Sequence, residues 1–275
     1  LWAFIEPNQV YSNTGTGLNN GTEWGSANLI GDTANNITNL FLSNDNFMVG
    51  REDGLFHFDS DGGQHQLRPD LRTNRSTDNF KYVTEWQAGI YHSEIDGMGE
   101  ITSYNAYEPM GPLHDLDDIG KRGDVVGLAA DKDWIYVAIK DGAATPEYWI
   151  YKGREVRKGG ELRWLWCPFI YLGENATATL AVIQHSATVR KLWFGKGDAS
   201  YYVILSDNPT DDSTYKFAAD GYVRMSWDYG TDPNWDKLWQ SAVLEVTGAT
   251  TDITVQVQYL KDESAIAECI PASTN

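Results

Sequence analysis

Hydrophobic and polar positions alternate in short runs along most of the chain, and turn-forming residues separate the runs. The clearest stretch is residues 37–63, ITNLFLSNDNFMVGREDGLFHFDSDGG. Its apolar runs are Ile37–Leu42, Phe47–Gly50 and Leu55–Phe58. The Asp53-Gly54 step between the last two runs is typical of a two-residue hairpin turn. This stretch therefore predicts three antiparallel strands.

The same three-strand pattern recurs three times further along the chain. The later copies are residues 80–105, 125–152 and 179–205. The residues that mark the four middle strands are Phe47, Ile90, Ile135 and Leu192. Successive markers lie 43, 45 and 57 residues apart, which fits the repeat of about 40 to 50 residues of a four-stranded propeller blade. An insert around Gly153–Gly160 lengthens the last interval, and in the second copy we expect Gly97 and Gly99 at the second turn.

Further strands are expected outside these triplets. Outer strands fit Arg163–Leu172 and Tyr215–Phe217, and a fifth set fits Tyr222–Asp228, Leu238–Thr247 and Asp252–Leu260. In the last of these, DITVQVQYL, apolar residues occupy every second position, which is typical of a strand with one solvated face.

The predicted fold class is all-β, because no window of about 12 residues combines helical periodicity with capping residues at both ends. We predict a β-propeller of about five blades, or four blades plus a C-terminal β-sandwich-like unit. The expected division is an N-terminal arm or closing strand over 1–28, blades one to four over 29–221, and the C-terminal β unit or fifth blade over 222–275. Asp115–Gly120 fits at most one short helical turn.

The N-terminal segment is expected to be largely irregular. Residues 6–28 are rich in Asn, Gly, Thr and Ser, a composition that favours loops. The stretch TEWGSANLIGD, residues 22–32, is the one part that fits a strand, which would close the ring against the final blade.

Composition and charge exclude several classes of partner. The 275 residues are 41% hydrophobic, enough for a core, and the formal net charge is −18. So acidic a chain disfavours nucleic acid and anionic membrane surfaces as partners. No apolar run is long enough to span a membrane. The start of the chain lacks the features of a signal peptide. Because it begins at Leu1 without an initiator Met, we expect a processed, trimmed or unread N-terminus.

The two cysteines, Cys167 and Cys269, are too few for a disulfide scaffold or a cysteine-based metal site, and one disulfide between them stays open. The sequence contains no GxSxG motif, Walker A motif or metal-binding histidine pair. We therefore expect no enzyme and no cofactor. Glycoside hydrolysis is the alternative, with carboxylates at strand ends or turns as candidates: Glu52, Asp53, Glu85 and Asp228.

Two acidic turns and a few aromatic residues are the remaining candidates for binding. Asp59 and Asp61 offer alternate carboxylates to calcium, as does the cluster Asp115, Asp117 and Asp118, although a solvated turn is the expected state of both. Tryptophans at predicted strand edges or in loops that suit stacking on a sugar are Trp86, Trp227, Trp235 and Trp239. Most of the 11 tryptophans are expected to fill the space between blades.

Two resemblances concern the repeats themselves. The string VGREDGLFHFDSDGG, Val49–Gly63, resembles the repeat of periplasmic sensor propellers. Segments spread over residues 24–262 resemble propeller-like proteins of tailed bacteriophages. In those proteins a terminal Asp-x-x-x-Asp-Lys-x-Trp step follows the blades, and here it matches Asp232, Asp236, Lys237 and Trp239.

The phage resemblance implies a non-enzymatic virion structural protein, associated with the tail or exposed on the surface, that acts in assembly and host attachment. It brings no catalytic residue. The implied partners are other virion proteins and further copies of this chain, with a host-surface glycan as an additional candidate, and the implied location is the virion. The competing hypothesis is a secreted carbohydrate-binding or glycoside-hydrolysing β-propeller.

Overall fold

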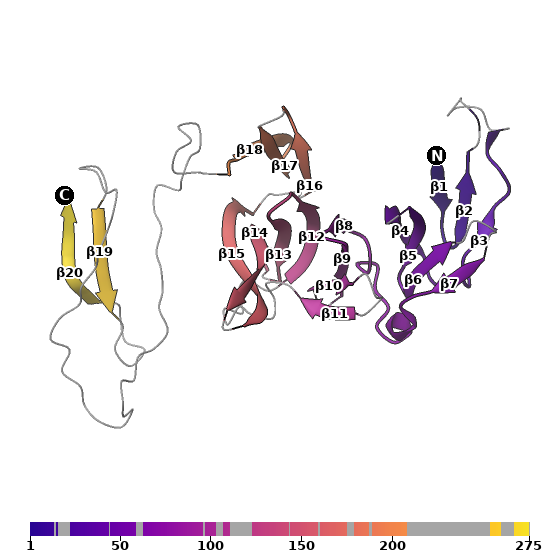
Figure 1. Cartoon of the computed structure of the whole chain (residues 1–275), viewed down its shortest axis with the longest axis horizontal. Helices are drawn as coiled ribbons and strands as arrows, with labels where there is room; N and C mark the ends of the chain where they lie inside the picture. Colours follow the sequence, from indigo (N-terminus) through magenta and orange to yellow (C-terminus); the bar gives the residue numbers. More distant parts are fainter. Residues whose placement is uncertain are drawn as a thin grey trace, which may run out of the picture. The chain divides into compact units, whose positions relative to one another are not determined.

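The computed structural model divides the chain into two units, Leu1–Phe217 and Ala218–Asn275 (Figure 1). The residues that the structure describes are 1–13, 15, 23–43, 45–58, 63–95, 97–102, 107–110, 123–142, 144–158, 160–174, 179–186, 189–207, 254–259 and 267–274. Among them, no helix is long and apolar enough to cross a membrane.

The described residues of the first unit form five antiparallel sheets. The N-terminal sheet holds β1 (Trp2–Ile5), β2 (Gln9–Ser12) and β3 (Asn28–Leu29). Blade 1 holds β4 (Ile37–Ser43), β5 (Asn46–Arg51), β6 (Gly54–Phe58) and β7 (Gln64–Gln66). Blade 2 holds β8 (Val83–Trp86), β9 (Gly89–Glu94), β10 (Gly97–Ile101) and β11 (Tyr107–Met110). Blade 3 holds β12 (Gly123–Ala130), β13 (Ile135–Asp141), β14 (Tyr148–Lys158) and β15 (Glu161–Gly173). Blade 4 holds β16 (Leu180–Gln184), β17 (Arg190–Lys196) and β18 (Ala199–Leu205).

Within each blade, every strand pairs with the next strand in the sequence, so each sheet is a local up-and-down meander. A single 3-10 turn, η2 (Pro69–Arg72), lies between blades 1 and 2. The all-β fold with propeller-like repeated sheets is therefore confirmed. Eight of the twelve strands predicted for the four copies have their observed counterparts within one residue at both ends, among them β4, β6 and β18.

The hydrophobic core lies between successive sheets. One cluster joins the N-terminal sheet to blade 1 and another joins blade 1 to blade 2. A third joins blades 2 and 3, and a fourth joins blades 3 and 4. Inner strands are consequently buried on both faces: in β13, five consecutive residues from Ile135 to Ile139 are buried. The repeated module thus cannot bury its apolar surface alone and depends on its neighbours.

The first hairpin turn lies one residue earlier than predicted. Arg51 pairs with Gly54, so the two-residue loop is Glu52–Asp53 and Gly54 begins β6. Gly54 has no positive φ, although a glycine in a two-residue hairpin turn usually adopts one. A glycine is required there for another reason: a Cβ would lie 2.6 Å from Nε2 of Gln66 and 2.9 Å from the carbonyl oxygen of Arg68.

Two predicted interruptions of strands are in fact parts of strands. Gly97 and Gly99 lie in β10, and the turn falls just before Gly97, whose φ is 127°. The insert around Gly153–Gly160 forms the end of β14 and the turn of the long β14–β15 hairpin, in which Gly153 pairs with Trp166. Gly153 permits a close approach, because a Cβ there would lie 2.5 Å from the Trp166 ring, whereas Gly160 has a φ of 91° and open space around it.

The N-terminal segment is more regular than predicted. β2 lies within the stretch expected to be irregular, and Val10 on it is fully buried against blade 1. β3 pairs with β2 through Gln9 and Leu29. The apolar signal of β2 is a single valine among polar residues, which is too short to reveal a strand in the sequence.

In the second unit, the described residues form a two-stranded antiparallel sheet of β19 (Thr254–Tyr259) and β20 (Ala267–Thr274). β19 confirms the strand expected within Asp252–Leu260. β20 was not predicted, because it contains Pro271 and small residues instead of an alternating pattern. The predicted strands Tyr215–Phe217, Tyr222–Asp228 and Leu238–Thr247 and the turn at Asp115–Gly120 lie outside the described residues, so the number of blades stays a prediction.

Candidate functional site

Trp86, a predicted sugar-stacking residue, is a core residue. Its side chain is 6% exposed, and its ring lies 5.9 Å from the ring of Tyr91 and 5.7 Å from that of Trp164. These rings fill the interface between blades 2 and 3. In this structure the face of Trp86 is therefore covered by protein.

The candidate catalytic carboxylates lie at opposite ends of blade 1. Glu52 and Asp53 form the β5–β6 turn, whereas Oε1 of Glu85 accepts a hydrogen bond of 2.8 Å from Ser43 at the β4–β5 turn. The six-residue strand β5 separates these turns by about 17 Å, at about 3.4 Å per residue. Carboxylate pairs of glycosidases lie about 5 to 10 Å apart, so these residues do not form such a pair.

Several predicted residues lie outside the described part of the chain: Asp59, Asp61, Asp115, Asp117, Asp118, Trp227, Asp228, Trp235 and Trp239. In the part that the structure describes, no three His, Cys, Asp or Glu side chains are close enough to share a metal ion. Cys167, on β15, carries a free thiol, and the side chain of Cys269 is not among those described.

A buried ion pair attaches the N-terminal segment to blade 1. Nε of Arg51 donates to Oδ1 of Asp53 at 3.0 Å, and Nη1 donates to the backbone oxygens of Ile30 and Asp32. Arg51 is fully buried and its guanidinium lies over the ring of Phe56. Asp53, a candidate catalytic acid, is thus a structural partner of Arg51.

A second buried polar cluster joins blade 1 to blade 2. Arg68, which follows β7, donates to Glu94 of β9 at 2.8 Å and to both carboxylate oxygens of Asp70. His92, fully buried on β9, lies 3.5 Å from the same guanidinium. Burial, and to a lesser extent Arg68, lowers the pKa of His92 from 6.5 to about 3. A neutral imidazole sealed in the protein suits packing rather than proton transfer with a substrate.

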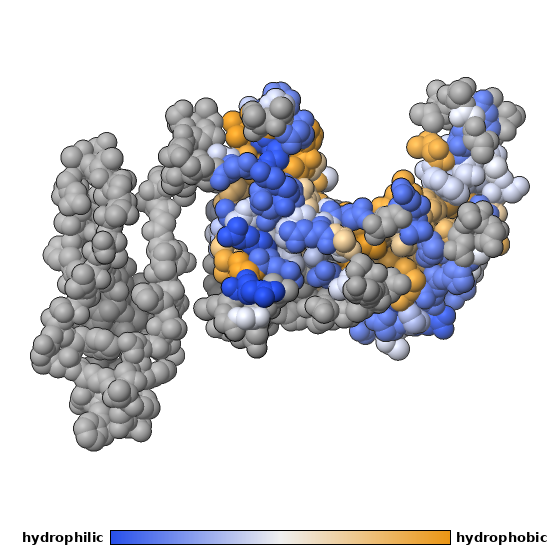
Figure 2. Space-filling view, in the orientation of Figure 1, coloured by the Kyte–Doolittle hydropathy of each residue, from blue (hydrophilic) through white to orange (hydrophobic). Residues whose placement is uncertain are grey.

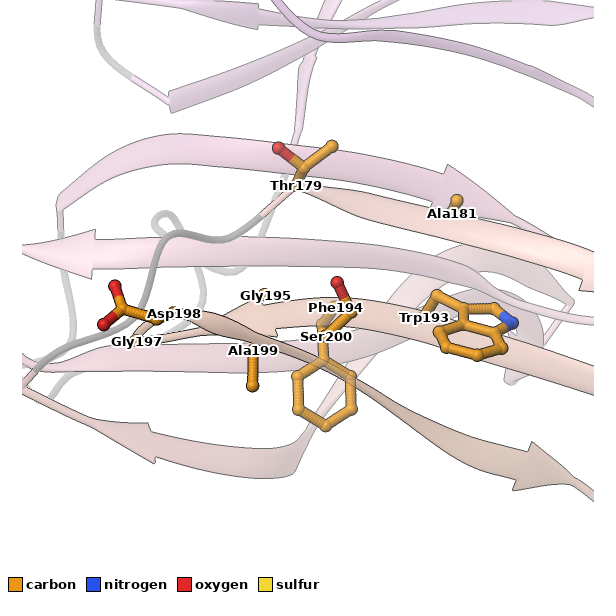
Figure 3. A pocket seen from close by; sticks show the side chains of 9 residues that line it. All are labelled: Thr179, Ala181, Trp193, Phe194, Gly195, Gly197, Asp198, Ala199 and Ser200. Atoms are coloured by element: carbon orange, nitrogen blue, oxygen red, sulfur yellow. The ribbon is translucent and has the colours of Figure 1, made fainter.

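A depression on the described surface lies on blade 4 and has a volume of about 460 Å³. Figure 3 shows Asp198 at one end of it and Trp193 at the other, with Thr179 and Ala181 on the neighbouring strand. Asp198 is the single ionisable residue among those that line it, and hydrolysis of a glycosidic bond needs two carboxyl groups. The depression is therefore suited to contact rather than to acid–base chemistry.

The outer face of blade 4 is apolar and aromatic. Trp193 and Tyr202 pair across β17 and β18 with ring centroids 4.9 Å apart, and the ammonium of Lys191 lies 4.0 Å from the Tyr202 ring. Ile183 and Tyr202 are each 49% exposed. Hydrophobic residues reach the surface over β16–β18 in Figure 2. The alternation of β16–β18 predicts the strands but does not indicate that both faces carry apolar side chains.

A second apolar surface lies on β1. Leu1, Trp2, Phe4 and Ile5 are 65%, 40%, 38% and 57% exposed, and Figure 2 shows hydrophobic surface near the N-terminal end of this strand. Among the described residues, β1 pairs on one side only, with β2. A strand edge with exposed apolar side chains is a site for pairing with another strand.

Comparison with known proteins leaves the family open. No known protein family matches this sequence. No curated protein sequence matches it either. Two solved structures of the extracellular domain of BT4673 from B. thetaiotaomicron are similar in fold, one described as part of a one-component system and the other of a hybrid two-component system.

The TM-scores of these two structures are 0.41 and 0.38, with 12% sequence identity in both cases. The similarity covers 78% of this chain, which spans 28% of the length of each of those chains. Similarity at this level assigns no function to this protein. Neither structure is a phage protein, so the phage resemblance stays an expectation.

Proposed function

We propose that this protein is a non-enzymatic structural and attachment protein of a bacteriophage particle, present in several copies and exposed on the tail or another surface of the virion. The sequence resemblance supports the phage origin. The single observation that supports assembly is the exposed apolar strand β1 at the edge of the N-terminal sheet. The partner of β1 in this proposal is a neighbouring copy of the chain.

The composition of β1 favours self-association. Two copies of a chain with net charge −18 repel one another over most of their surfaces. β1 contains no charged side chain, so pairing through this edge brings no carboxylates together. Antiparallel pairing of two β1 strands would satisfy backbone groups at the open edge and cover Phe4 and Ile5.

The arrangement of acidic residues supports a non-enzymatic role. Glu85 and the Glu52–Asp53 turn lie at opposite ends of strand β5 of blade 1, and Asp53 forms an ion pair with Arg51. Asp198 is the one carboxylate that lines the blade 4 depression. A scaffold that presents surfaces for contact accounts for these features more simply than a hydrolase does.

The experiment compares the wild type with Ile5→Lys and with the matched control Leu29→Lys. Leu29, on β3 of the same sheet, is 56% exposed, close to the 57% of Ile5, but does not lie on the β1 edge. Light scattering after size-exclusion chromatography should show oligomers for the wild type and for Leu29→Lys and monomers for Ile5→Lys. Electron microscopy of particles should locate wild-type protein on the virion and lose it with Ile5→Lys.

Equal association of all three proteins would contradict the role of β1. A wild-type protein that is absent from particles would contradict the virion location.

A secreted carbohydrate-binding propeller is the second candidate, favoured by the Trp193–Tyr202 pair on blade 4, in which Tyr202 is 49% exposed. In that case the protein would be a free monomer, and Trp193→Ala would remove binding to neutral glycans while Ile5→Lys would have no effect.

A further inference from the structure

The β14–β15 hairpin is locally basic in a strongly acidic chain. Residues 148–173 contain five Lys or Arg and two Glu, whereas the whole chain has 21 basic and 39 acidic residues. Two of these cations meet one aromatic ring: the Lys152 ammonium lies 4.8 Å from the centroid of the Trp134 ring, and the Arg154 guanidinium lies 4.4 Å from it. Lys152 is also 4.9 Å from the ring of Phe169.

Lys152 and Arg154 lie on one face of the hairpin. They are two residues apart on β14, and their partners on β15 are Cys167 and Leu165. The alternate residues pair Gly153 with Trp166, whose ring packs into the core between blades 2 and 3. The face that carries the two cations is therefore turned away from that core, and Arg154 is exposed.

The turn before β13 fixes the backbone of Trp134. Oδ1 of Asp131 accepts hydrogen bonds of 2.8 Å from the backbone nitrogens of both Asp133 and Trp134. This Asx-type turn restrains the loop, so the indole ring is presented to Lys152 and Arg154 from a defined position.

Carboxylates of the same loop already have partners. Nη1 of Arg190 lies 3.2 Å from Asp131 and 3.8 Å from Asp133, and Lys132 donates to Asp207 at 2.7 Å. Lys152 and Arg154, in contrast, have no carboxylate within 4.0 Å among the described residues. Two neighbouring cations thus remain available to an external anion.

We propose that Trp134, Lys152, Arg154 and Phe169 form a binding site for uronic-acid-containing oligosaccharides. The guanidinium of Arg154 binds the sugar carboxylate with two parallel hydrogen bonds, and Lys152 adds a second positive charge. The apolar edges of Trp134 and Phe169 contact the C–H groups of the sugar ring. Trp134 also holds both cations in place through cation–π contacts. This inference rests on the attachment part of the proposed function and names the class of glycan.

Charge density favours an acidic saccharide over other polyanions. The chain as a whole repels surfaces with closely spaced negative charges, such as nucleic acid or anionic membranes. A uronate chain places its charges on separate sugar rings, and one carboxylate at a time meets the two cations.

The test measures binding of short oligogalacturonides by isothermal titration calorimetry, with the fully methyl-esterified oligosaccharide as the uncharged counterpart. Lys152→Gln/Arg154→Gln should raise the Kd about tenfold or more, which corresponds to about 1.4 kcal/mol. Arg157→Gln is the matched control, because Arg157 is an exposed cation on the opposite face of the same strand. It should change the Kd less than about twofold, and the esterified oligosaccharide should not bind.

If the double variant does not fold, Arg154→Gln replaces it in the binding measurement, because it changes only one exposed side chain. Arg154→Gln should still raise the Kd severalfold. Trp134→Ala should raise the Kd, and Trp134→Phe should restore part of the affinity, because a phenyl ring still supports a cation–π contact. Three results would each overturn the site. The first is an equal loss of affinity in Arg157→Gln and in the double variant, and the second is equal binding of the esterified oligosaccharide. The third is binding of the wild type to anionic vesicles that the double variant retains. Ile5→Lys should bind oligogalacturonides with wild-type affinity, so failure of this site and failure of β1-mediated assembly are separate results.

Discussion

Acidification should weaken the fold through one buried residue, His92. The imidazole is 0% exposed and lies between the Phe80 ring, 4.4 Å away, and the Arg68 guanidinium. Because burial lowers its pKa from 6.5 to about 3, His92 stays neutral in the folded protein down to about pH 3. In the unfolded chain the same group takes up a proton near pH 6.5.

The sign of the effect follows from this difference. Below pH 6.5 the unfolded state binds a proton that the folded state excludes, so the free energy of unfolding falls as the pH falls. Each pH unit between 6.5 and about 3 removes about 1.4 kcal/mol, which gives a loss of about 2 kcal/mol at pH 5 and about 5 kcal/mol at pH 3. Asp70, beside Arg68, has a pKa below its usual 3.8, mainly through its hydrogen bonds with Arg68, and stays ionised above pH 5.

The assay is urea unfolding followed by tryptophan fluorescence at pH 7, 6 and 5. Between pH 7 and pH 5, the wild type should lose about 2 kcal/mol more than His92→Gln, which has no imidazole to protonate. His65→Gln, an exposed histidine on β7, is the control and should keep the pH dependence of the wild type. If His92→Gln loses as much stability as the wild type, His92 is protonated freely in the folded state and the argument from burial fails.

Two further predictions concern hairpin turns. Gly54→Val should lower the free energy of unfolding by about 1–3 kcal/mol in urea titrations, because its Cβ overlaps two neighbouring atoms. The control, Gly142→Ala, has open space around its Cβ and should leave the free energy of unfolding unchanged. Equal effects of the two substitutions would contradict the steric argument. Gln87 and Ala88 form the β8–β9 turn with φ of 47° and 68°. Ala88→Gly should therefore raise the melting temperature by relieving about 1 kcal/mol of backbone strain, and an unchanged or lower value would contradict this.

The strands of the blades could be predicted because their signal is local. Alternation over five to seven residues and a polar turn at each end are sufficient to place β4, β13 and β17 within about two residues. β7, with the sequence Gln64-His65-Gln66, has no apolar residue and forms only because β6 offers it an open edge. Such a strand depends on its partner and leaves no pattern of its own.

The sites could not be predicted in the same way, because they depend on contacts between strands and loops far apart in the sequence. Trp86 and Trp134 both lie near strand ends in the sequence, yet one is covered by Trp164 from blade 3 and the other meets two cations of β14. The local charge excess of residues 148–173 was visible in the sequence. The candidate binding site could be recognised only from the structure, which places β14 next to the loop before β13.

Stacking of the sheets also explains where apolar surface is exposed. Of the twelve large hydrophobic residues that are exposed in the described part of the chain, four belong to the N-terminal sheet, Leu1 directly precedes it, and three belong to blade 4. These two sheets each have one described neighbour, whereas blades 1, 2 and 3 each have two. A module that needs a neighbour on each face leaves apolar surface wherever a neighbour is lacking, so contacts with other copies are expected at β1. The proposed glycan site lies instead on the hairpin of blade 3, an inner blade, where the half-buried Lys152 and the exposed Arg154 serve recognition rather than assembly.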